Sequence, residues 1–366
     1  MKSQNGKYGN SLVTLNKIRN VMNNKKIIVT GYQGYIGIPL VKMLSEAGYE
    51  VLGIDTNYFG KDCEFFEPGI HISELRKDIR QIDEKDIKGA SAICHLAGLS
   101  NDPVGELNQE LTYDINYLTS VRLAQLAKKA GVERFIFSSS CSMYGISGGE
   151  NALDETVSFN PITAYAKSKV YAEKELLPLA DKNFSVTFLR NATAYGVSPK
   201  LRLDLVVNNL VGWAVTTGQI RIMSDGTPWR PLIHAEDIAR AFVAVIEAPV
   251  EKVNGVAFNT GRNEDNHQVK DIAEMVGNVV PGCEVIITGE HGSDSRSYKV
   301  DFRKIKSELP GFKPRYDLKK GIEQLSEYYK RYNMNKEKFE GRYFTRLKQL
   351  NYLIDQNKIN EKLFWV

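Results

Sequence analysis

A tyrosine and a lysine four positions apart are the first candidates for chemistry in this sequence. Tyr165 and Lys169 stand in the segment YAKSK, and this spacing places both side chains on one face of a helix. A phenol titrates near pH 10, but a neighbouring ammonium favours the phenolate. The pair is therefore suited to exchanging a proton with a hydroxyl group near neutral pH.

A run of hydroxyl side chains precedes this pair. Residues 137–142 read FSSSCS and close a predicted strand over 134–139. In an open α/β sheet, ligands bind beyond the carboxyl ends of the parallel strands. A serine there can hydrogen-bond the same substrate oxygen as the tyrosine. The alternative is a polar strand end that caps the following turn.

A glycine-rich turn near the start of the chain suits a dinucleotide. The segment TGYQGYIG, residues 30–37, follows a predicted strand over 26–30 and opens a predicted helix over about 36–47. Glycines at this spacing let backbone amides approach a pyrophosphate and let the helix pack closely on the sheet. We expect the whole turn to contact the cofactor, through Gly31, Tyr32, Gln33, Gly34, Tyr35, Ile36 and Gly37.

An acid at the end of the next strand indicates which dinucleotide. Asp55 ends the predicted strand over 50–55, where a carboxylate binds the adenosine ribose hydroxyls and repels a 2′-phosphate. Thr56 and Asn57 follow it, with no arginine to receive such a phosphate. We therefore expect NAD as the cofactor, and its nicotinamide cation would further favour the Tyr165 phenolate.

The elements that must position these residues alternate between short apolar runs and amphipathic stretches, which indicates βαβ units and a parallel sheet. Further strands are predicted near 70–75 and over 92–96, 185–190, 219–223, 255–259 and 284–288. Further helices are predicted over about 108–130, 164–179, 205–217, 236–246, 269–276 and 318–329.

This alternation of strands and helices is typical of the α/β class. The regular βαβ pattern is interrupted over 191–233 and again over 262–330. We expect a Rossmann domain, with a doubly wound parallel sheet, from residues 25–190 plus 234–261. A smaller C-terminal α/β lobe, which would bind the substrate, comprises 191–233 plus 262–330. Residues 1–24 read as a polar leader, and 331–366 as a tail of one or two amphipathic helices.

Composition excludes several classes of protein. The 366 residues carry 48 Lys and Arg against 44 Asp and Glu, too small an excess to argue for a nucleic-acid partner. A hydrophobic content of 42% supports a sizeable core. No apolar run reaches the roughly 18 residues of a membrane helix, so we expect no membrane partner. The four scattered cysteines indicate free thiols in a cytoplasmic protein and no metal site.

Together these segments resemble the extended short-chain dehydrogenase/reductase family that acts on nucleotide sugars. The resemblance covers about 26–325 and rests on TGYQGYIG, Asp55, DIR (78–80), HLAG (95–98), Asn116, SSSCSMYG (138–145), YAKSK and RPLIHAEDIA (230–239). It implies a bound nicotinamide cofactor and a lobe that binds a nucleoside diphosphate sugar. It also implies a homodimer formed through the two helices at about 108–130 and 164–179, and a place in polysaccharide biosynthesis.

The resemblance also implies roles for particular residues. The catalytic set becomes Ser140, Tyr165 and Lys169. Further cofactor contacts fall on Asp78, Ile79, Leu96, Ala97, Gly98, Asn116, Ser138, Tyr165 and Lys169. Substrate contacts fall on Ser140, Cys141, Ser142, Asn191, Thr193, Arg202, Arg230 and Arg296. Arginines suit the diphosphate because a guanidinium binds phosphate oxygens in pairs.

One segment departs from the family pattern. Many members carry an asparagine three residues after the arginine that ends a strand, whereas this chain has Arg190-Asn191-Ala192-Thr193. Either Asn191 or Thr193 can therefore line the sugar. Lys200 and Arg202 add two cations nearby, and a solvated loop is the alternative for that stretch.

Three reactions dominate the family: 4,6-dehydration, epimerisation through a keto sugar, and keto reduction. Dehydratases carry an Asp-Glu pair after the catalytic hydroxyl residue, where this chain has Cys141 and Ser142, so dehydration is disfavoured.

The expected NAD favours an epimerase that oxidises and re-reduces one sugar carbon, with C4 the expected position. An NAD(P)H-dependent 4-keto reductase or dehydrogenase is the alternative. A non-catalytic NAD-sensing protein would not need the complete catalytic set. UDP, GDP, CDP and dTDP sugars all remain open.

Overall fold

The computed structural model describes residues 25–100, 102–146, 151–290 and 296–366. The polar leader expected over 1–24 lies outside the described residues. Among the described residues, no helix combines the length and the apolar character needed to cross a membrane.

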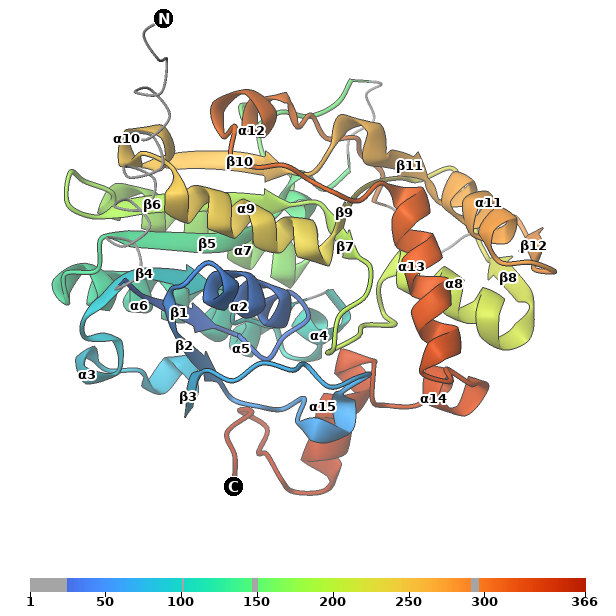
Figure 1. Ribbon diagram of the computed structural model, residues 1–366, viewed down its shortest axis with the longest axis horizontal. Coiled ribbons are helices and arrows are strands. Elements are labelled where there is room, and N and C mark those ends of the chain that lie inside the picture. The colour runs from blue at the N-terminus through green and yellow to red at the C-terminus, as the bar shows by residue number, and fades with distance from the viewer. Residues whose placement is uncertain (1–24, 101, 147–150, 291–295) are drawn as a thin grey trace, which may run out of the picture.

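A seven-stranded parallel sheet forms the centre of the molecule, in the order β10-β6-β5-β4-β1-β2-β3 (Figure 1). Its strands are β1 (Lys26–Thr30), β2 (Glu50–Asp55), β3 (Ser73–Arg76), β4 (Ala90–His95), β5 (Arg134–Ser140), β6 (Ser185–Asn191) and β10 (Val256–Thr260). Most are short apolar runs buried on both faces, as parallel strands require. The strand order reverses between β4 and β1, which makes the crevice there the expected ligand site. The predicted Rossmann fold is confirmed.

Helices cover both faces of this sheet. α2 (Gly37–Glu46) and α9 (Ala235–Glu247) pack together on one face, in front of the sheet in Figure 1. The other face carries α5 (Gln109–Tyr113), a π-helical turn (Asp114–Leu118), α6 (Thr119–Lys129) and α7 (Ala164–Leu176). The short helices α3 (Glu84–Ile87), α4 (Asp102–Leu107), α10 (Val250–Val253) and α12 (Arg303–Glu308) complete this part and were not predicted.

Two small sheets extend the molecule on the right of Figure 1. One has the order β11-β9-β7, from β7 (Thr193–Tyr195), β9 (Trp229–His234) and β11 (Asn266–Gln268). The other pairs β8 (Gln219–Ile222) with β12 (Glu284–Ile287). They pack with α8 (Val206–Thr217), α11 (Val269–Val279) and α13 (Leu318–Arg331). These elements occupy the segments expected for the smaller lobe, and the domain division itself stays a prediction.

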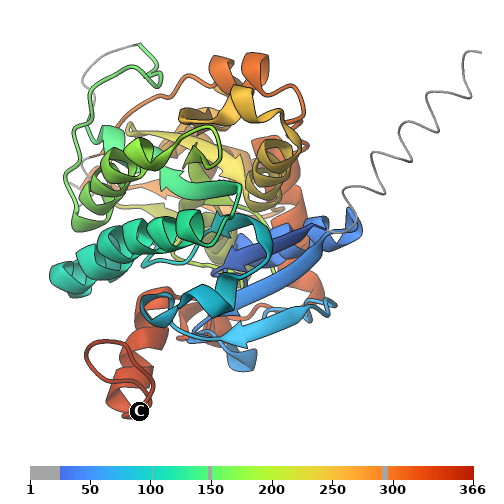
Figure 2. The same ribbon diagram turned by 90° about the vertical axis from the view of Figure 1, so that its left-hand side faces the viewer.

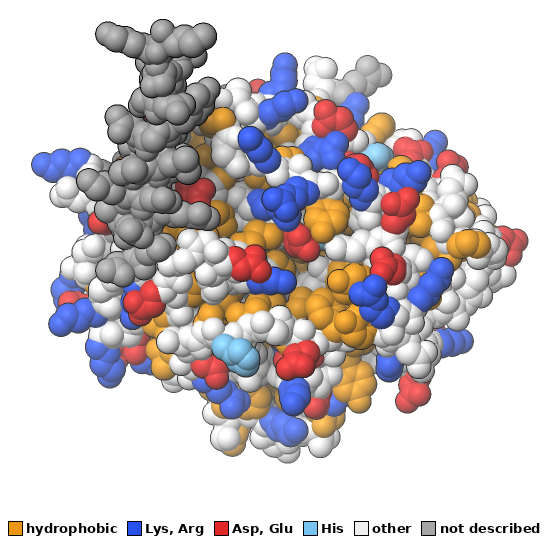
Figure 3. All heavy atoms as spheres, viewed as in Figure 1, with side chains coloured by type: hydrophobic (Ala, Val, Ile, Leu, Met, Phe, Trp, Pro, Cys, Tyr) orange, Lys and Arg blue, Asp and Glu red, His pale blue; other side chains and the backbone are white. Residues whose placement is uncertain are grey.

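The tail forms two short helices, α14 (Lys336–Glu340) and α15 (Arg346–Asp355), followed by an extended end. Figures 1 and 2 show this tail below the edge of the central sheet that β3 forms. Basic and acidic side chains are interspersed over the face in Figure 3, in keeping with a net charge of only +4.

Candidate active site

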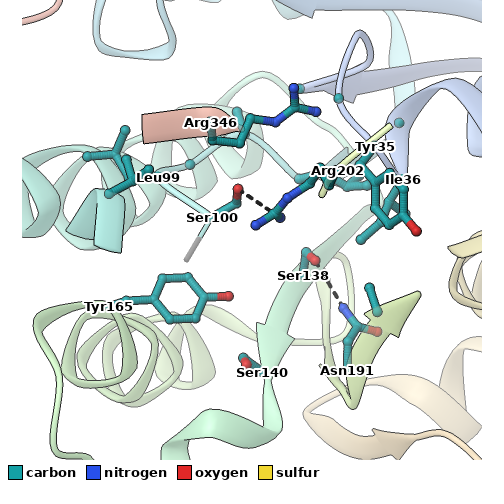
Figure 4. Close-up of a pocket in the computed structure, with 18 of the residues that line it drawn as sticks. Tyr35, Ile36, Leu99, Ser100, Ser138, Ser140, Tyr165, Asn191, Arg202 and Arg346 are labelled. Carbon is teal, nitrogen blue, oxygen red and sulfur yellow. Dashed lines mark hydrogen bonds between the residues drawn. The ribbon is translucent and has the colours of Figure 1, made fainter. Parts of the chain in front are cut away.

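A cavity of about 520 Å³ lies beyond the carboxyl ends of the central strands (Figure 4). It brings most of the predicted site residues together. The predicted residues that line it are Gly31, Gln33, Gly34, Tyr35, Ile36, Gly37, Asp55, Asp78, Ile79, Leu96, Ala97, Gly98, Ser138, Ser140, Ser142, Tyr165, Lys169, Asn191, Thr193, Arg202, Arg230 and Arg296. Tyr32, Asn116 and Cys141 are described but do not belong to this lining.

The glycine turn between β1 and α2 has no room for side chains. Gly31 has a φ of +74°, and a Cβ on it would lie 2.7 Å from the Ala97 nitrogen. A Cβ on Gly37 would lie 2.3 Å from the Gly31 carbonyl oxygen. Ile36, the N-cap of α2, provides no capping side chain, and the first turn holds no acid. The amino end of α2 therefore suits an anion such as a pyrophosphate.

Asp55 lines the same cavity and is fixed by two backbone amides. Its carboxylate accepts hydrogen bonds from the Gln33 nitrogen at 3.1 Å and the Asn57 nitrogen at 2.8 Å. Burial raises the pKa of Asp55 above its usual range, and these two hydrogen bonds oppose the shift. A rigid acceptor beside the glycine turn suits the ribose hydroxyls of an adenosine. The turn and Asp55 together fit NAD.

A buried polar network holds the backbone along this part of the cavity. The Asn116 side chain accepts from the Leu99 nitrogen at 2.7 Å and donates to the Leu99 oxygen at 3.0 Å. The His95 ring bridges the Thr30 and Ser120 hydroxyls at 2.6 and 2.8 Å. Asn116 is fully buried and positions the backbone of Leu99. A contact between Asn116 and the cofactor stays a prediction.

Two more predicted residues turn into the protein. The Tyr32 ring packs against Gly53 of β2, and its hydroxyl donates to Glu74. Cys141 is 1% exposed, and its thiol donates to the Arg190 carbonyl oxygen at 3.0 Å. Both side chains are buried. A cofactor contact for Tyr32 and a substrate contact for Cys141 stay predictions.

Ser140, Tyr165 and Lys169 converge at the end of β5. Figure 4 shows the Tyr165 hydroxyl directed into the cavity, toward the side where Ser138 and Ser140 lie. The Ser140 Oγ donates to the Ser142 hydroxyl at 2.9 Å and accepts from the Ser142 nitrogen at 3.1 Å. Thr163 caps α7 by accepting from the Ala166 nitrogen, which fixes where the helix begins and so which face presents Tyr165.

Lys169 lies near the Tyr165 ring and is held there by a hydrogen bond to the backbone. Its Nζ donates to the Ser138 carbonyl oxygen at 2.8 Å and lies 5.8 Å from the centre of the Tyr165 ring. Burial lowers the pKa of Lys169 to about 8, and Glu173 opposes the shift. Burial also raises the pKa of Tyr165 to about 12, against the effect of the Ser140 hydroxyl. The sequence predicted that the neighbouring ammonium lowers the pKa of Tyr165. In this structure the effect of burial is larger, and the phenol carries its proton.

Asn191 and Thr193 both line the cavity, and a contact of either with the sugar stays a prediction. The Asn191 Nδ2 donates to the Ser138 hydroxyl at 3.1 Å (Figure 4). Its Oδ1 is buried and has no hydrogen-bond partner among the described residues. A buried acceptor without a partner is costly, so this atom marks a place where a ligand donor fits.

Three arginines, Arg202, Arg230 and Arg296, line the cavity. Arg202 binds both Asp204 oxygens, at 3.0 and 2.9 Å, and also the Ser100 hydroxyl at 3.2 Å. Arg296 pairs with Asp102, and Arg230 donates to the Arg296 carbonyl oxygen. The arginines thus come with their own partners, which hold the guanidinium groups in place.

The sequence predicted no cavity residue from the tail, yet Arg346 and Leu350 of α15 belong to the lining. Tyr58 and Phe59, after β2, are two further lining residues that were missed. The only available signal for the tail was that Arg346, Leu350 and Leu353 share one helical face. No local motif connects that face to residues some 300 positions earlier.

Comparison with known proteins agrees with this geometry. The model of the NAD dependent epimerase/dehydratase family matches residues 27–261. The UDP-glucose 4-epimerase of Bacillus subtilis (strain 168) is 28% identical over 334 residues, which cover 82% of this chain and 94% of that protein. The UDP-glucose 4-epimerase of Homo sapiens is 31% identical over 271 residues, 65% of this chain and 77% of that protein. The solved structure of MoeE5 in complex with UDP-glucose and NAD has a TM-score of 0.71 and 28% identity, and covers 84% of this chain and 99% of that one.

Proposed function

The chain belongs to the NAD dependent epimerase/dehydratase family, and from this premise we propose that it is a UDP-hexose 4-epimerase. The observation that carries the proposal is the Ser140, Tyr165 and Lys169 set at one end of a cavity whose other end fits NAD. The UDP-glucose 4-epimerases among its relatives, and the UDP-glucose bound in MoeE5, support UDP as the nucleotide and C4 as the carbon.

When bound, NAD supplies a hydride acceptor and donor, and a positive charge in its oxidised form. The residues of this chain handle the accompanying proton. With the positive charge of the oxidised cofactor and the Lys169 ammonium nearby, Tyr165 acts as the phenolate. Its Oη then takes the proton of the C4 hydroxyl as that carbon becomes a ketone, and returns it when the hydroxyl re-forms on the opposite face. The Ser140 hydroxyl, which donates to the Ser142 hydroxyl in this structure, turns to donate a hydrogen bond to the same sugar oxygen. A proton donor positioned in this way contributes roughly 10²- to 10⁴-fold to the rate.

Lys169 and Asn191 position this machinery. The Lys169 ammonium, anchored on the Ser138 carbonyl, stabilises negative charge on the Tyr165 oxygen when the phenol loses its proton. The unpartnered Oδ1 of Asn191 accepts a hydrogen bond from the ligand that occupies this end of the cavity.

We assign the substrate diphosphate to the arginines Arg202, Arg230 and Arg296. All three line the cavity, and the carboxylates and carbonyls that hold them reduce the freedom they lose on binding. The residues after Ser140 support epimerisation over dehydration, because Cys141 is buried in the core and Ser142 is no acid. Neither side chain can protonate a leaving hydroxyl.

The test is to identify the nucleotide that the purified protein releases on denaturation, and then to incubate the protein with UDP-glucose without adding cofactor. We expect close to one NAD per chain and conversion of UDP-glucose to an equilibrium mixture with UDP-galactose. A protein that carries NADP, or that acts only when reduced cofactor is added, would instead be a reductase and would overturn the proposal.

A further inference from the structure

Hydrogen bonds and ring contacts hold the C-terminal tail, residues 331–366, against the end of the cavity that we assign to the adenosine. The Trp365 Nε1 donates to the Thr56 carbonyl oxygen at 2.7 Å, and the Gln349 Nε2 to the Tyr58 carbonyl oxygen at 3.1 Å. The Phe364 ring lies 3.8 Å from the Arg80 guanidinium. These contacts fix the tail to the segments that directly follow β2 and β3, and so fix the first turn of α15 at the cavity.

Arg346, the first residue of α15, lines the cavity together with Leu350 of the same helix. It is 4% exposed. Its guanidinium lies 4.0 Å from the centre of the Phe59 ring, and Nη2 donates to the Lys200 carbonyl oxygen at 3.1 Å. Nη1 is buried and has no hydrogen-bond partner in the part of the chain that the structure describes. Figure 4 shows the side chain extending toward the part of the cavity where Arg202 and Tyr35 lie.

Among the described residues, no carboxylate is hydrogen-bonded to the Arg346 guanidinium. Asp204 is engaged in two bonds with Arg202, and Asp55 accepts from two backbone amides. Burial lowers the pKa of Arg346 to about 10, and Arg202 adds to the shift while Asp204 and Asp55 oppose it. Asp204 and Asp55 attract this cation, but a buried donor without an acceptor is costly, so Nη1 marks a place where an acceptor atom of a ligand fits.

We propose that Arg346 binds a phosphate group of the AMP half of the bound dinucleotide. The inference rests on the proposed NAD site and adds to it a contact from the C-terminal tail. The glycine turn and the uncapped start of α2 border the same cavity and already favour an anion there. A guanidinium gives a short, charge-assisted hydrogen bond to phosphate, and Nη1 is the donor that remains for it.

The test compares ligands that differ only in phosphate, using the full-length chain freed of nucleotide. Dissociation constants for adenosine, AMP, NAD and NADP are measured by calorimetry in the unchanged protein and in Arg346→Gln and Arg346→Lys. Lys348→Gln is the matched control, because it removes an exposed charge from the same helix. We expect Arg346→Gln to weaken AMP and NAD roughly 30-fold, as for a lost hydrogen bond to a charged group, and adenosine less than about twofold.

The Arg346→Lys variant keeps the proposal testable if Arg346→Gln does not fold. If Arg346→Gln does not fold, Arg346→Lys must still lose affinity for AMP and NAD while adenosine binding is kept. Equal losses for adenosine and AMP would overturn the proposal and make Arg346 a packing residue of the tail. A loss confined to NADP would also overturn it, because the anion would then be a 2′-phosphate. Failure of the unchanged protein to bind AMP and NAD would instead refute the NAD site and, with it, the proposed function.

Discussion

At the scale of residues, burial controls the proton chemistry of this site. Tyr165 and Lys169 are both shifted toward their neutral forms, the tyrosine upward and the lysine down to about 8. The types and spacing of these residues were sufficient to predict that they meet. Their protonation states were not predictable, because desolvation depends on neighbours such as the Phe137 ring, 4.6 Å from the lysine ammonium.

Tyr165→Phe removes the atom that we assign to proton transfer. We expect the turnover of UDP-glucose to fall roughly 10³-fold, while NAD affinity changes less than about twofold because the ring still fills its place. The measurement is the rate at which bound cofactor is reduced after the sugar is mixed with the enzyme. Tyr171→Phe, an exposed tyrosine on the same helix, is the control. Full activity in Tyr165→Phe would refute the assigned role.

His234 makes stability depend on pH. The ring is buried, stacks on Tyr316 at 3.7 Å between centroids, and caps α9 by accepting from the Glu236 nitrogen. Burial lowers its pKa from 6.5 to about 3. Between these values the unfolded chain binds a proton that the folded chain does not, so stability is lost as pH falls, by up to about 1.4 kcal/mol per pH unit.

The test is the free energy of unfolding of His234→Asn between pH 6 and pH 4. Asparagine keeps a capping oxygen but cannot take up the proton, so we expect a slope shallower by about one proton. His71→Asn, at an exposed histidine, is the control. An unchanged slope in His234→Asn would show that another group causes the acid sensitivity.

At the scale of elements, the strands and helices around the cofactor site follow their sequence patterns closely. The exceptions are set by contacts between distant segments. A single helix was expected over about 108–130, but the structure inserts a π-helical turn at Asp114–Leu118, from which Asn116 binds Leu99. Such turns often occur at functional sites. β7 and β11 have only three residues each, too few for a periodic pattern.

Gly37→Ala tests the close packing of the glycine turn. The added Cβ would lie 2.3 Å from the Gly31 oxygen and 2.5 Å from the Tyr32 oxygen, both backbone atoms. The turn must therefore open, and we expect NAD affinity to fall on the order of 100-fold. Gly60→Ala is the control, since its Cβ would have no neighbour closer than 3.7 Å. Equilibrium binding of NAD checks the pair, and equal affinities would contradict a pyrophosphate site at this turn.

At the scale of the whole molecule, what the sequence could not predict is how far-apart segments meet. The Rossmann fold follows from repeated local patterns. The position of Arg346 depends instead on the tail folding back onto residues near Thr56 and Lys200. The inward turn of Cys141 likewise depends on a bond to the neighbouring strand β6.

A dimer is the prediction that belongs to this scale. Leu118, Tyr171 and Leu177 are 53%, 44% and 48% exposed on the two helical segments that the family resemblance assigns to the dimer contact. Tyr171 also touches the Tyr117 ring, so the two segments form one surface. We expect analytical ultracentrifugation to give twice the chain mass, and Leu118→Glu with Tyr171→Glu to give the chain mass. Ile287→Glu, at an exposed apolar residue on β12, is the control. A monomeric unchanged protein would refute the interface.

The most direct test of the proposed function follows a deuterium atom at C4. UDP-glucose labelled there is incubated with the purified protein in ordinary water, without added cofactor, and the products are analysed by NMR. An epimerase that oxidises and re-reduces the same carbon must yield UDP-galactose with the deuterium still at C4. Loss of the label to solvent, release of a keto sugar with stoichiometric reduced cofactor, or elimination of water would contradict the proposed reaction.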